Sequence, residues 1–273
     1  MKSLQTLTLL IILLSICSSA QSNFNNKQQD KETNTSLPKV ANQSFKRGEK
    51  LEYRIHYGVV DAGTATLEVL QEKKQIAGRE TYHIVGTGKS NRFFDFFFKV
   101  RDTYESYIDT EGLFPWFFKR RVNEGGYKIE QDYVFNQEKR LVKTNKGETY
   151  EVPIGIQDMV SAFYHARTKN YANLKLGDVI KIETFIDNEI WTAGMKFLGT
   201  DTIKVETGTY SCLKFAPVVQ KGRIFKNEED MVVWVSNDEN KIPIHARAKI
   251  LVGSIKMDLV EYSNLANPIA KLD

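Results

Sequence analysis

Alternation of apolar and polar side chains constrains the fold of this chain more than any other feature. Over residues 51–59, Leu, Tyr, Ile, Tyr and Val occupy every second position, with polar residues or glycine between them. Successive side chains of a strand point to opposite faces, so this pattern predicts a strand with one buried face. Asp61-Ala-Gly63 predicts a turn into a second strand from Ala65, and hence an antiparallel hairpin.

Similar short segments, separated by turns that contain Gly, Asn or Asp, recur along most of the chain. The further predicted strands are residues 81–85, 100–108, 127–135, 140–144, 179–186, 192–198, 202–206, 212–219, 231–235, 246–252 and 255–262. Short strands at this spacing are typical of antiparallel sheets. The sequence therefore predicts a mainly β fold, either a sandwich or an open barrel.

One segment breaks this pattern and predicts an amphipathic helix within residues 157–171. Asp158 is the expected N-cap, because its carboxylate can accept hydrogen bonds from free N–H groups of the first turn. Four apolar residues then fall on one stripe at helical spacing: Met159, Ala162, Phe163 and Ala166. Val160 and Tyr164 widen this stripe.

The strands on either side of this helix show matching landmarks at a nearly constant offset. Gly48 and Gly177, each before a strand, lie 177 − 48 = 129 positions apart, and Gly78 and Gly208 lie 208 − 78 = 130 apart. We therefore predict two similar antiparallel curved sheets or half-barrels, an internal repeat bridged by the helix. The first β half would cover residues 45–156 and the second 172–265. Together they would form one compact unit.

The N-terminus predicts export. A short basic start, an apolar core over residues 7–14 and the small residues of Ser18-Ser-Ala20 make residues 1–20 a secretory signal peptide. Leu14-Ser-Ile-Cys17 resembles a lipobox, so lipidation of Cys17 is the alternative to cleavage after Ala20. Residues 21–44 are rich in Asn, Gln, Lys, Thr and Ser, which predicts a disordered tether.

Composition excludes some classes of function. Removal of residues 1–20 lowers the net charge from +4 to +3, and no segment concentrates basic residues, so nucleic acid is not an expected partner. No later apolar run reaches the length of a membrane helix. Cys212 would be the sole cysteine of the mature chain, expected to be buried and inert, so no intramolecular disulfide is expected.

Several motifs resemble those of one known family. They are the opening Phe45-Lys-Arg-Gly-Glu-Lys-Leu-Glu-Tyr53 with Ala62-Gly63, the helix Asp158–Tyr164 with Arg167, Val233–Asp238 with Ile242-Pro243, and Val252-Gly-Ser-Ile255. In this order, over about residues 45 to 262, they resemble exported bacterial proteins of domain-of-unknown-function family 3108. The resemblance implies an exported, β-rich protein and no activity, cofactor or catalytic residue.

Residue patterns of catalysis are missing from the sequence. The four histidines (His56, His83, His165 and His245) stand at no metal-ligand spacing, and no nucleophile elbow or phosphate-binding glycine loop occurs. Carboxylate pairs such as Glu228-Glu-Asp230 fall in loop-like segments. We therefore expect no catalytic residues, no metal and no cofactor.

Two aromatic runs, Phe93–Phe98 and Phe114–Phe118, are the candidate binding elements. A strand cannot direct all of these rings to one core, so some must meet a second surface. That surface is either more protein, if the sheet is covered on both faces, or an apolar groove or membrane-facing lip. The candidate ligand-binding residues are Phe94, Phe97, Trp116, Phe163, Tyr164 and Arg167.

Arg167 has two possible roles. It can serve the fold, as a charge at the helix C-terminus or in a salt bridge to Asp102 or Asp109, or it can hold an anionic head group.

These features favour a non-enzymatic protein of the periplasm or outer membrane that binds a lipid, a glycolipid or another amphipathic ligand. The alternative is a structural or interaction module of the envelope, with a protein or polysaccharide partner.

Overall fold

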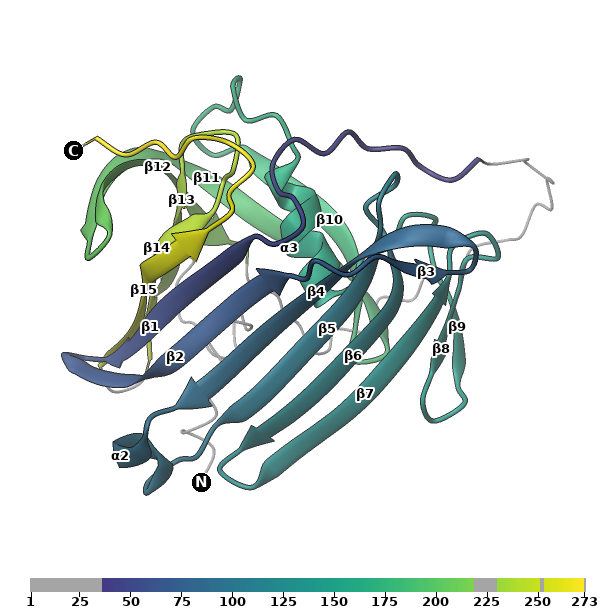
Figure 1. Ribbon diagram of the computed structural model, residues 1–273, viewed down its shortest axis with the longest axis horizontal. Coiled ribbons are helices and arrows are strands. Elements are labelled where there is room, and N and C mark those ends of the chain that lie inside the picture. Colours follow the sequence, from purple (N-terminus) through teal and green to yellow (C-terminus); the bar gives the residue numbers. More distant parts are fainter. Residues whose placement is uncertain (1–35, 219–229, 251–252, 273) are drawn as a thin grey trace.

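The strands of the computed structural model form one continuous antiparallel sheet (Figure 1). The structure describes residues 36–218, 230–250 and 253–272. The strands are β1 Lys50–Tyr57, β2 Val60–Val69, β3 Lys74–Ile76, β4 Arg79–Ser90, β5 Arg101–Asp109, β6 Pro115–Glu124, β7 Tyr127–Asn136, β8 Leu141–Thr144, β9 Thr149–Glu151, β10 Val179–Ile186, β11 Glu189–Val205, β12 Gly208–Pro217, β13 Met231–Ser236, β14 Pro243–Lys249 and β15 Ser254–Ser263. The helices are α2 Arg92–Asp95 and α3 Met159–Arg167.

Pairing of the first strand with the last makes this a single sheet. The order is β10-β11-β12-β13-β14-β15-β1-β2-β4-β5-β6-β7-β8-β9, with β3 paired to β4. Tyr53 of β1 lies opposite Leu259 of β15 on one side and Ala65 of β2 on the other. The predicted mainly β, antiparallel fold is confirmed. A repeat of two separate sheets is not confirmed, because backbone hydrogen bonds join the two runs of strands through β1 and β15.

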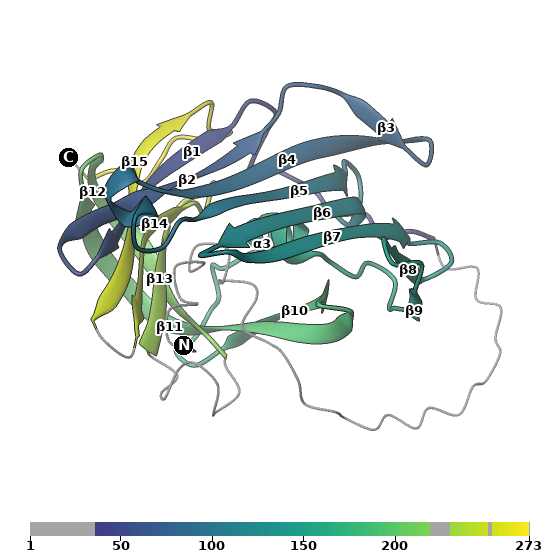
Figure 2. The same ribbon diagram turned by 90° about the horizontal axis from the view of Figure 1, so that it is seen from below.

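The sheet curls so that its two ends approach each other around α3. Strands β4–β7 form one layer, β10 and the start of β11 lie opposite, and α3 lies between them (Figure 2). The segment before α3 also pairs with β10 through a parallel bridge between Gln157 and Thr184. The helix thus lies inside a barrel-like curl and contacts both β5 and β10.

The described residues form three apolar clusters, and the two larger ones cross the predicted halves, whereas the third joins Phe197 of β11 to Leu213 and Phe215 of β12. The first contains residues of β1 and β2 together with β12–β15, such as Leu51, Trp234 and Leu259. The second contains residues of β4–β8, α3 and β10, such as Ile84, Tyr164 and Phe185. The strands of each half therefore bury part of their apolar surface against strands of the other half.

The landmarks of the predicted repeat nevertheless occupy matching places in the strand order. Gly48 and Gly177 both have positive φ, of 82° and 91°, directly before β1 and β10. Leu113 and Lys241, 241 − 113 = 128 positions apart, have φ of 53° and 50° in the turns before β6 and β14. Duplication of the two β halves, residues 45–156 and 172–265, stays a prediction.

The helix begins as predicted and ends earlier. Asp158 Oδ1 accepts hydrogen bonds from the N–H groups of Val160 (2.7 Å) and Ser161 (2.8 Å), which confirms the N-cap. Its C-cap is Thr168, whose side chain donates to the carbonyl of His165. The helix therefore has nine residues instead of extending over 157–171. Phe163 is only partly buried, and Tyr164 takes the more buried place on the stripe.

Strand β6 was not among the predicted strands. Its aromatic start, Pro115-Trp-Phe-Phe118, hides the alternation that the structure displays: Trp116 and Phe118 are buried, whereas Phe117 is only partly covered. The Phe117 ring meets Tyr107 at 5.8 Å between centroids. Tyr107 is the cross-strand neighbour of Phe117 in β5, so this contact lies on the outer face of the same sheet and is not a second layer of protein.

Part of the predicted tether contacts the sheet. Val40 N donates to the carbonyl of Glu111 (2.8 Å), and Ser44 is buried, with its hydroxyl donating to the carbonyl of Arg167 (2.8 Å). The predicted signal peptide and Cys17 lie outside the described residues.

Cys212 is buried in β12 with a free thiol, as predicted. Burial, together with the charges of Asp201 and Asp238, raises the pKa of this thiol to about 12. In a Cys17→Ser chain, we therefore expect a maleimide to label the folded protein at least about 100-fold more slowly than the unfolded protein, because only the thiolate reacts. Labelling rates with and without denaturant check this, and equal rates would contradict it.

Candidate functional site

The structure divides the predicted site residues among three places. Phe163, Tyr164 and Arg167 lie together on α3, and Phe94 and Phe97 lie in and after α2. Trp116 is at the start of β6, whereas the end of β6 lies beside the α2 segment, through a bridge between Glu124 and Val100. The two aromatic runs therefore do not line a common groove.

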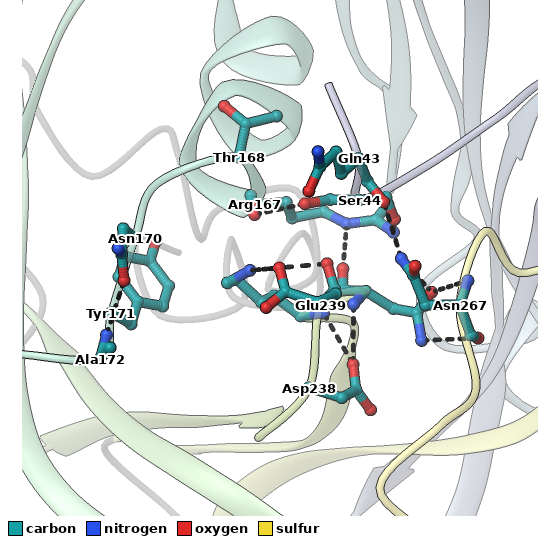
Figure 3. Close-up of polar contacts among 12 residues, drawn as sticks. Gln43, Ser44, Arg167, Thr168, Asn170, Tyr171, Ala172, Asp238, Glu239 and Asn267 are labelled. Carbon is teal, nitrogen blue, oxygen red and sulfur yellow. Dashed lines mark hydrogen bonds and ion pairs between the residues drawn. The ribbon is translucent and has the colours of Figure 1, made fainter. Parts of the chain in front are cut away.

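Arg167 is held in a closed set of contacts at the end of α3 (Figure 3). Its guanidinium forms two hydrogen bonds with the carboxylate of Glu49, at 2.6 and 2.7 Å. It also donates to the carbonyls of Ser44 (3.0 Å) and Asn240 (2.8 Å). The rings of Phe45, Phe163 and Tyr164 lie 5.0–5.7 Å from the guanidinium carbon.

This arrangement joins the N-terminal segment, the helix and the β13–β14 turn. Arg167 is 2% exposed and Glu49 is 0% exposed. The predicted partners, Asp102 and Asp109, were wrong: Asp109 instead accepts hydrogen bonds from Arg79 and from the indole of Trp116. A buried arginine with this many partners has a role in the fold.

A group of exposed apolar side chains from three segments lies at the α2 end of the sheet. We call it the aromatic rim: Val59 and Val60, Phe93, Phe96 and Phe97, and Tyr127. Asn91 N donates to the carbonyl of Ala62 (2.9 Å), which joins the α2 segment to β2. Gly125 N donates to the carbonyl of Lys99 (2.8 Å), which joins this segment to the β6–β7 turn.

The α2 segment is fixed at its base while its aromatic side chains project outward. Asn91 caps α2 by accepting a hydrogen bond from Phe94 N (2.9 Å). Phe94 packs partly against the core and meets the Tyr57 ring at 6.4 Å. Phe97 stays exposed, although its ring contacts those of Phe93 and Phe96. Of the two predicted residues here, Phe97 is therefore the more available to a ligand.

Behind the rim, β5 and β6 place four polar side chains among core residues. We call them the polar row: Asp102, Tyr104, Arg120 and Glu124. All four are buried and alternate with outward-facing residues, so they share a face with the core residues Phe118 and Val122. Asp102 is the second residue of β5 and Glu124 the last of β6, so both carboxylates are close to the rim.

Part of the hydrogen-bonding capacity of the polar row is unused. Arg120 donates through Nη1 to Asp187 (3.0 Å) and Gln131 (3.3 Å), and its guanidinium lies 5.6 Å from the centre of the Tyr104 ring. By geometry, the hydroxyl of Tyr104 and the Nε of Arg120 have no hydrogen-bond partner among the described residues. The Arg120 guanidinium nevertheless lies close enough to this hydroxyl to lower its pKa, against the larger effect of burial. Buried donors normally have a hydrogen-bond partner, so these two atoms lack the partner that burial usually requires.

Burial shapes the electrostatics of the polar row. It raises the pKa of Asp102, against the opposing effects of the Asn123 N–H, the Glu124 side chain and the charge of Arg120. It also raises the pKa of Tyr104, so this phenol stays protonated and can donate a hydrogen bond. With a neutral phenol, an arginine and two carboxyl groups, the row suits a ligand that carries both donors and acceptors.

Tertiary structure also brings histidines together. The carboxylate of Asp258 contacts His245 Nδ1 at 2.6 Å and His56 Nε2 at 3.2 Å. Burial raises the pKa of Asp258, but hydrogen bonding and charge from His245, with His56 and Lys256, outweigh it and lower the pKa overall. No group of three or more His, Cys, Asp or Glu residues in the described part of the chain could hold a metal ion.

Fold and sequence together define the class of protein: it is mainly β, and its described residues form one large open antiparallel sheet and two short helices. The chain belongs to the family of proteins of unknown function DUF3108, whose model matches residues 52–260. The resemblance inferred from its motifs is thereby confirmed. No curated protein matches the sequence. Within the described residues, no helix is both long and apolar enough to cross a membrane.

Three solved structures match the chain at low sequence identity. A β-barrel-like protein of domain of unknown function DUF1849 from Brucella abortus has 12% identity and a TM-score of 0.49, covering 84% of this chain and 99% of its own. A "putative lipoprotein" from Parabacteroides distasonis has 11% identity and a TM-score of 0.36, and the match covers 84% of this chain and 100% of that protein. The hypothetical protein CT021 from Chlamydia trachomatis has 10% identity and a TM-score of 0.37, and the match covers 85% of this chain and 94% of that protein.

Sequence reasoning found the aromatic part of this site and missed the polar part. Asp102, Tyr104, Arg120 and Glu124 alternate along two adjacent strands, so a period-two pattern of polar residues in otherwise apolar positions was the available signal. It could not be read in β6, because that strand was not predicted.

Proposed function

We propose that this protein is a non-enzymatic protein of the bacterial cell envelope that binds an amphipathic ligand, of the lipid or glycolipid type, at the α2 end of the sheet. The observation that carries the proposal is the polar row, with its unpartnered Tyr104 hydroxyl, directly behind the exposed aromatic rim. A head group with hydroxyl or phosphate oxygens would accept from Tyr104 and Arg120. An apolar part of the ligand would contact Phe94 and Phe97.

Export of the chain belongs to the same proposal and rests on the sequence of residues 1–20. The rest of the support is physical. An unpartnered buried hydroxyl costs about 1–3 kcal/mol, so a group that fills its hydrogen-bonding capacity is stabilised by binding there. The other candidate, an interaction module for protein or polysaccharide, would need neither the buried hydroxyl nor the arginine behind the rim.

The test compares two variants that each remove one buried hydroxyl. Tyr104→Phe deletes the hydroxyl of the polar row, and Tyr53→Phe deletes another buried, unpartnered hydroxyl, beside the Arg167 cluster. The full chain is exported in a bacterium and purified without detergent, then examined by native mass spectrometry and organic extraction. We expect a stoichiometric lipid-like ligand in the wild type and in Tyr53→Phe.

In Tyr104→Phe, titration with the extracted ligand should give binding about fivefold weaker, the equivalent of one hydrogen bond. Thermal stability should stay the same or rise slightly, because no existing hydrogen bond is lost. Equal affinity in both variants would remove the polar row from the site. A wild-type protein free of ligand, and unchanged by added lipid extracts, would overturn the proposal in favour of the interaction module.

A further inference from the structure

The aromatic rim concentrates exposed apolar surface at one end of the molecule. Twelve large apolar side chains are exposed in the described residues, and six of them belong to the rim. Val59 is 96% exposed and Phe96 87% exposed. Apolar side chains gathered in this way mark an interaction surface, whereas single exposed ones are ordinary.

Hydrogen bonds and ring contacts hold the three rim segments against one another, although they are far apart in the sequence. Besides the backbone bonds to Ala62 and Lys99, the side chain of Asn91 donates to the carbonyl of Asp61 (2.5 Å). The ring of Phe98 lies against Gly125, so closely that a Cβ there would clash with the ring and the ring would have to shift. The rim is therefore a preformed surface whose rings need little ordering when they bind.

The charge around the rim is positive. Lys89, Arg92, Lys99 and Lys128 are exposed beside the rim residues, and none of the four forms an ion pair with another described residue. The acidic neighbours have basic partners: Asp95 contacts Arg101 at 2.6 Å, and Asp61 contacts Arg54 at 3.8 Å. The rim therefore presents apolar rings surrounded by uncompensated basic side chains.

We propose that the aromatic rim docks the protein onto a bilayer surface rich in anionic phospholipid. Basic residues beside exposed aromatic side chains suit such a surface, because phosphate groups attract the lysines while the rings enter the boundary of the acyl chains. This inference goes beyond the proposed ligand site: the two share Phe97, but docking needs only the exposed face of the rim and no bound ligand. A docked rim would place the polar row close to the membrane.

The test measures co-sedimentation of the full chain, after export and purification, with vesicles of phosphatidylglycerol mixed with phosphatidylcholine and with vesicles of phosphatidylcholine alone. We expect binding to the anionic vesicles that falls with added salt. The double variant Phe96→Ser/Phe97→Ser should bind these vesicles at least about tenfold more weakly, because burial of one phenylalanine side chain alone is worth that much affinity. Lys89→Glu/Lys99→Glu should lose roughly fivefold per lysine on anionic vesicles.

The matched control replaces two exposed leucines outside the rim, Leu176→Ser/Leu272→Ser, and should bind like the wild type. All variants alter exposed side chains, so their melting temperatures should agree. No binding to anionic vesicles, or equal loss in the control, would overturn the proposal. Light scattering measures the oligomeric state of the wild type and of Phe96→Ser/Phe97→Ser. A wild-type dimer that becomes monomeric in this variant would show that the rim is an interface between two copies, and would also overturn membrane docking.

Discussion

Replacement of Arg167 by methionine is expected to lower the free energy of unfolding by about 3–5 kcal/mol, the cost of leaving a buried charge without its partner. Glu49 is 0% exposed and receives two hydrogen bonds from the guanidinium. The carbonyls of Ser44 and Asn240 would lose their donor in the same variant. Chemical denaturation, followed by circular dichroism, measures the loss.

Two further variants separate the buried charge from other causes. Glu49→Leu combined with Arg167→Met replaces the whole pair by apolar groups, so it should recover most of the loss. Arg121→Met removes an ion pair with Asp132 in which both side chains are about a third exposed, so it should cost less than about 1 kcal/mol. A double variant as unstable as the single Arg167→Met would contradict this account.

Removal of the carboxylate of Asp158 is expected to have the second largest effect. Asp158→Ala leaves the N–H groups of Val160 and Ser161 and the hydroxyl of Ser106 without an acceptor inside the core. The lost cap and the unpaired donors together should cost about 2–4 kcal/mol of the free energy of unfolding. Asp158→Asn keeps an oxygen for the helix N-terminus, so it should cost much less at pH 7. Denaturation of both variants at pH 7 measures the difference.

The same carboxyl should also make stability depend on pH in a direction unusual for an acid. Burial raises the pKa of Asp158 from 3.8 to about 6, against the opposing hydrogen bonds of Ser106, Ser161 and Val160. Between about pH 4 and 6 the folded state then binds this proton more readily than the unfolded state, so its contribution to stability rises as the pH falls and is lost as the pH rises through 6.

Other carboxylates act the opposite way, so the comparison needs a matched chain. The pKa values of Asp109 and Asp258 are lowered, because their hydrogen-bond partners outweigh burial, and their contributions to stability are lost in acid. The difference between the wild type and Asp158→Asn removes these common effects. From pH 7 to pH 4 the wild type should gain about 2–3 kcal/mol relative to the variant. A constant difference would contradict the raised pKa.

Local pattern was enough to predict many of the elements. Alternation over residues 51–59 predicted β1, because the two faces of a strand are encoded residue by residue. Asp158 identified the start of α3, because an N-cap acts within its own first turn. The local pattern did not predict β6, because the aromatic start of this strand is apolar at inward and outward positions alike.

The partners of these elements depended on the strand order, which no local pattern contains. Arg167 meets Glu49 across 118 positions of sequence and Asn240 across 73. The pairing of β1 with β15 brings the segment before β1 and the β13–β14 turn to the same end of the sheet. The same pairing makes one sheet where two were predicted.

Recognition of the candidate site also needed both the sequence and the tertiary structure. The exposed phenylalanines of the α2 segment are visible in the sequence as an aromatic run that cannot be wholly buried. Their assembly with Val59 and Tyr127 into one rim, and the buried Tyr104 and Arg120 behind it, follow only from the register of β2, β4, β5 and β6. Where apolar and polar residues alternate, the sequence alone determined which side chains face inward or outward, since that depends on periods of two and 3.6 residues. The tertiary structure decided which of them meet, because those contacts are set by long-range strand pairing.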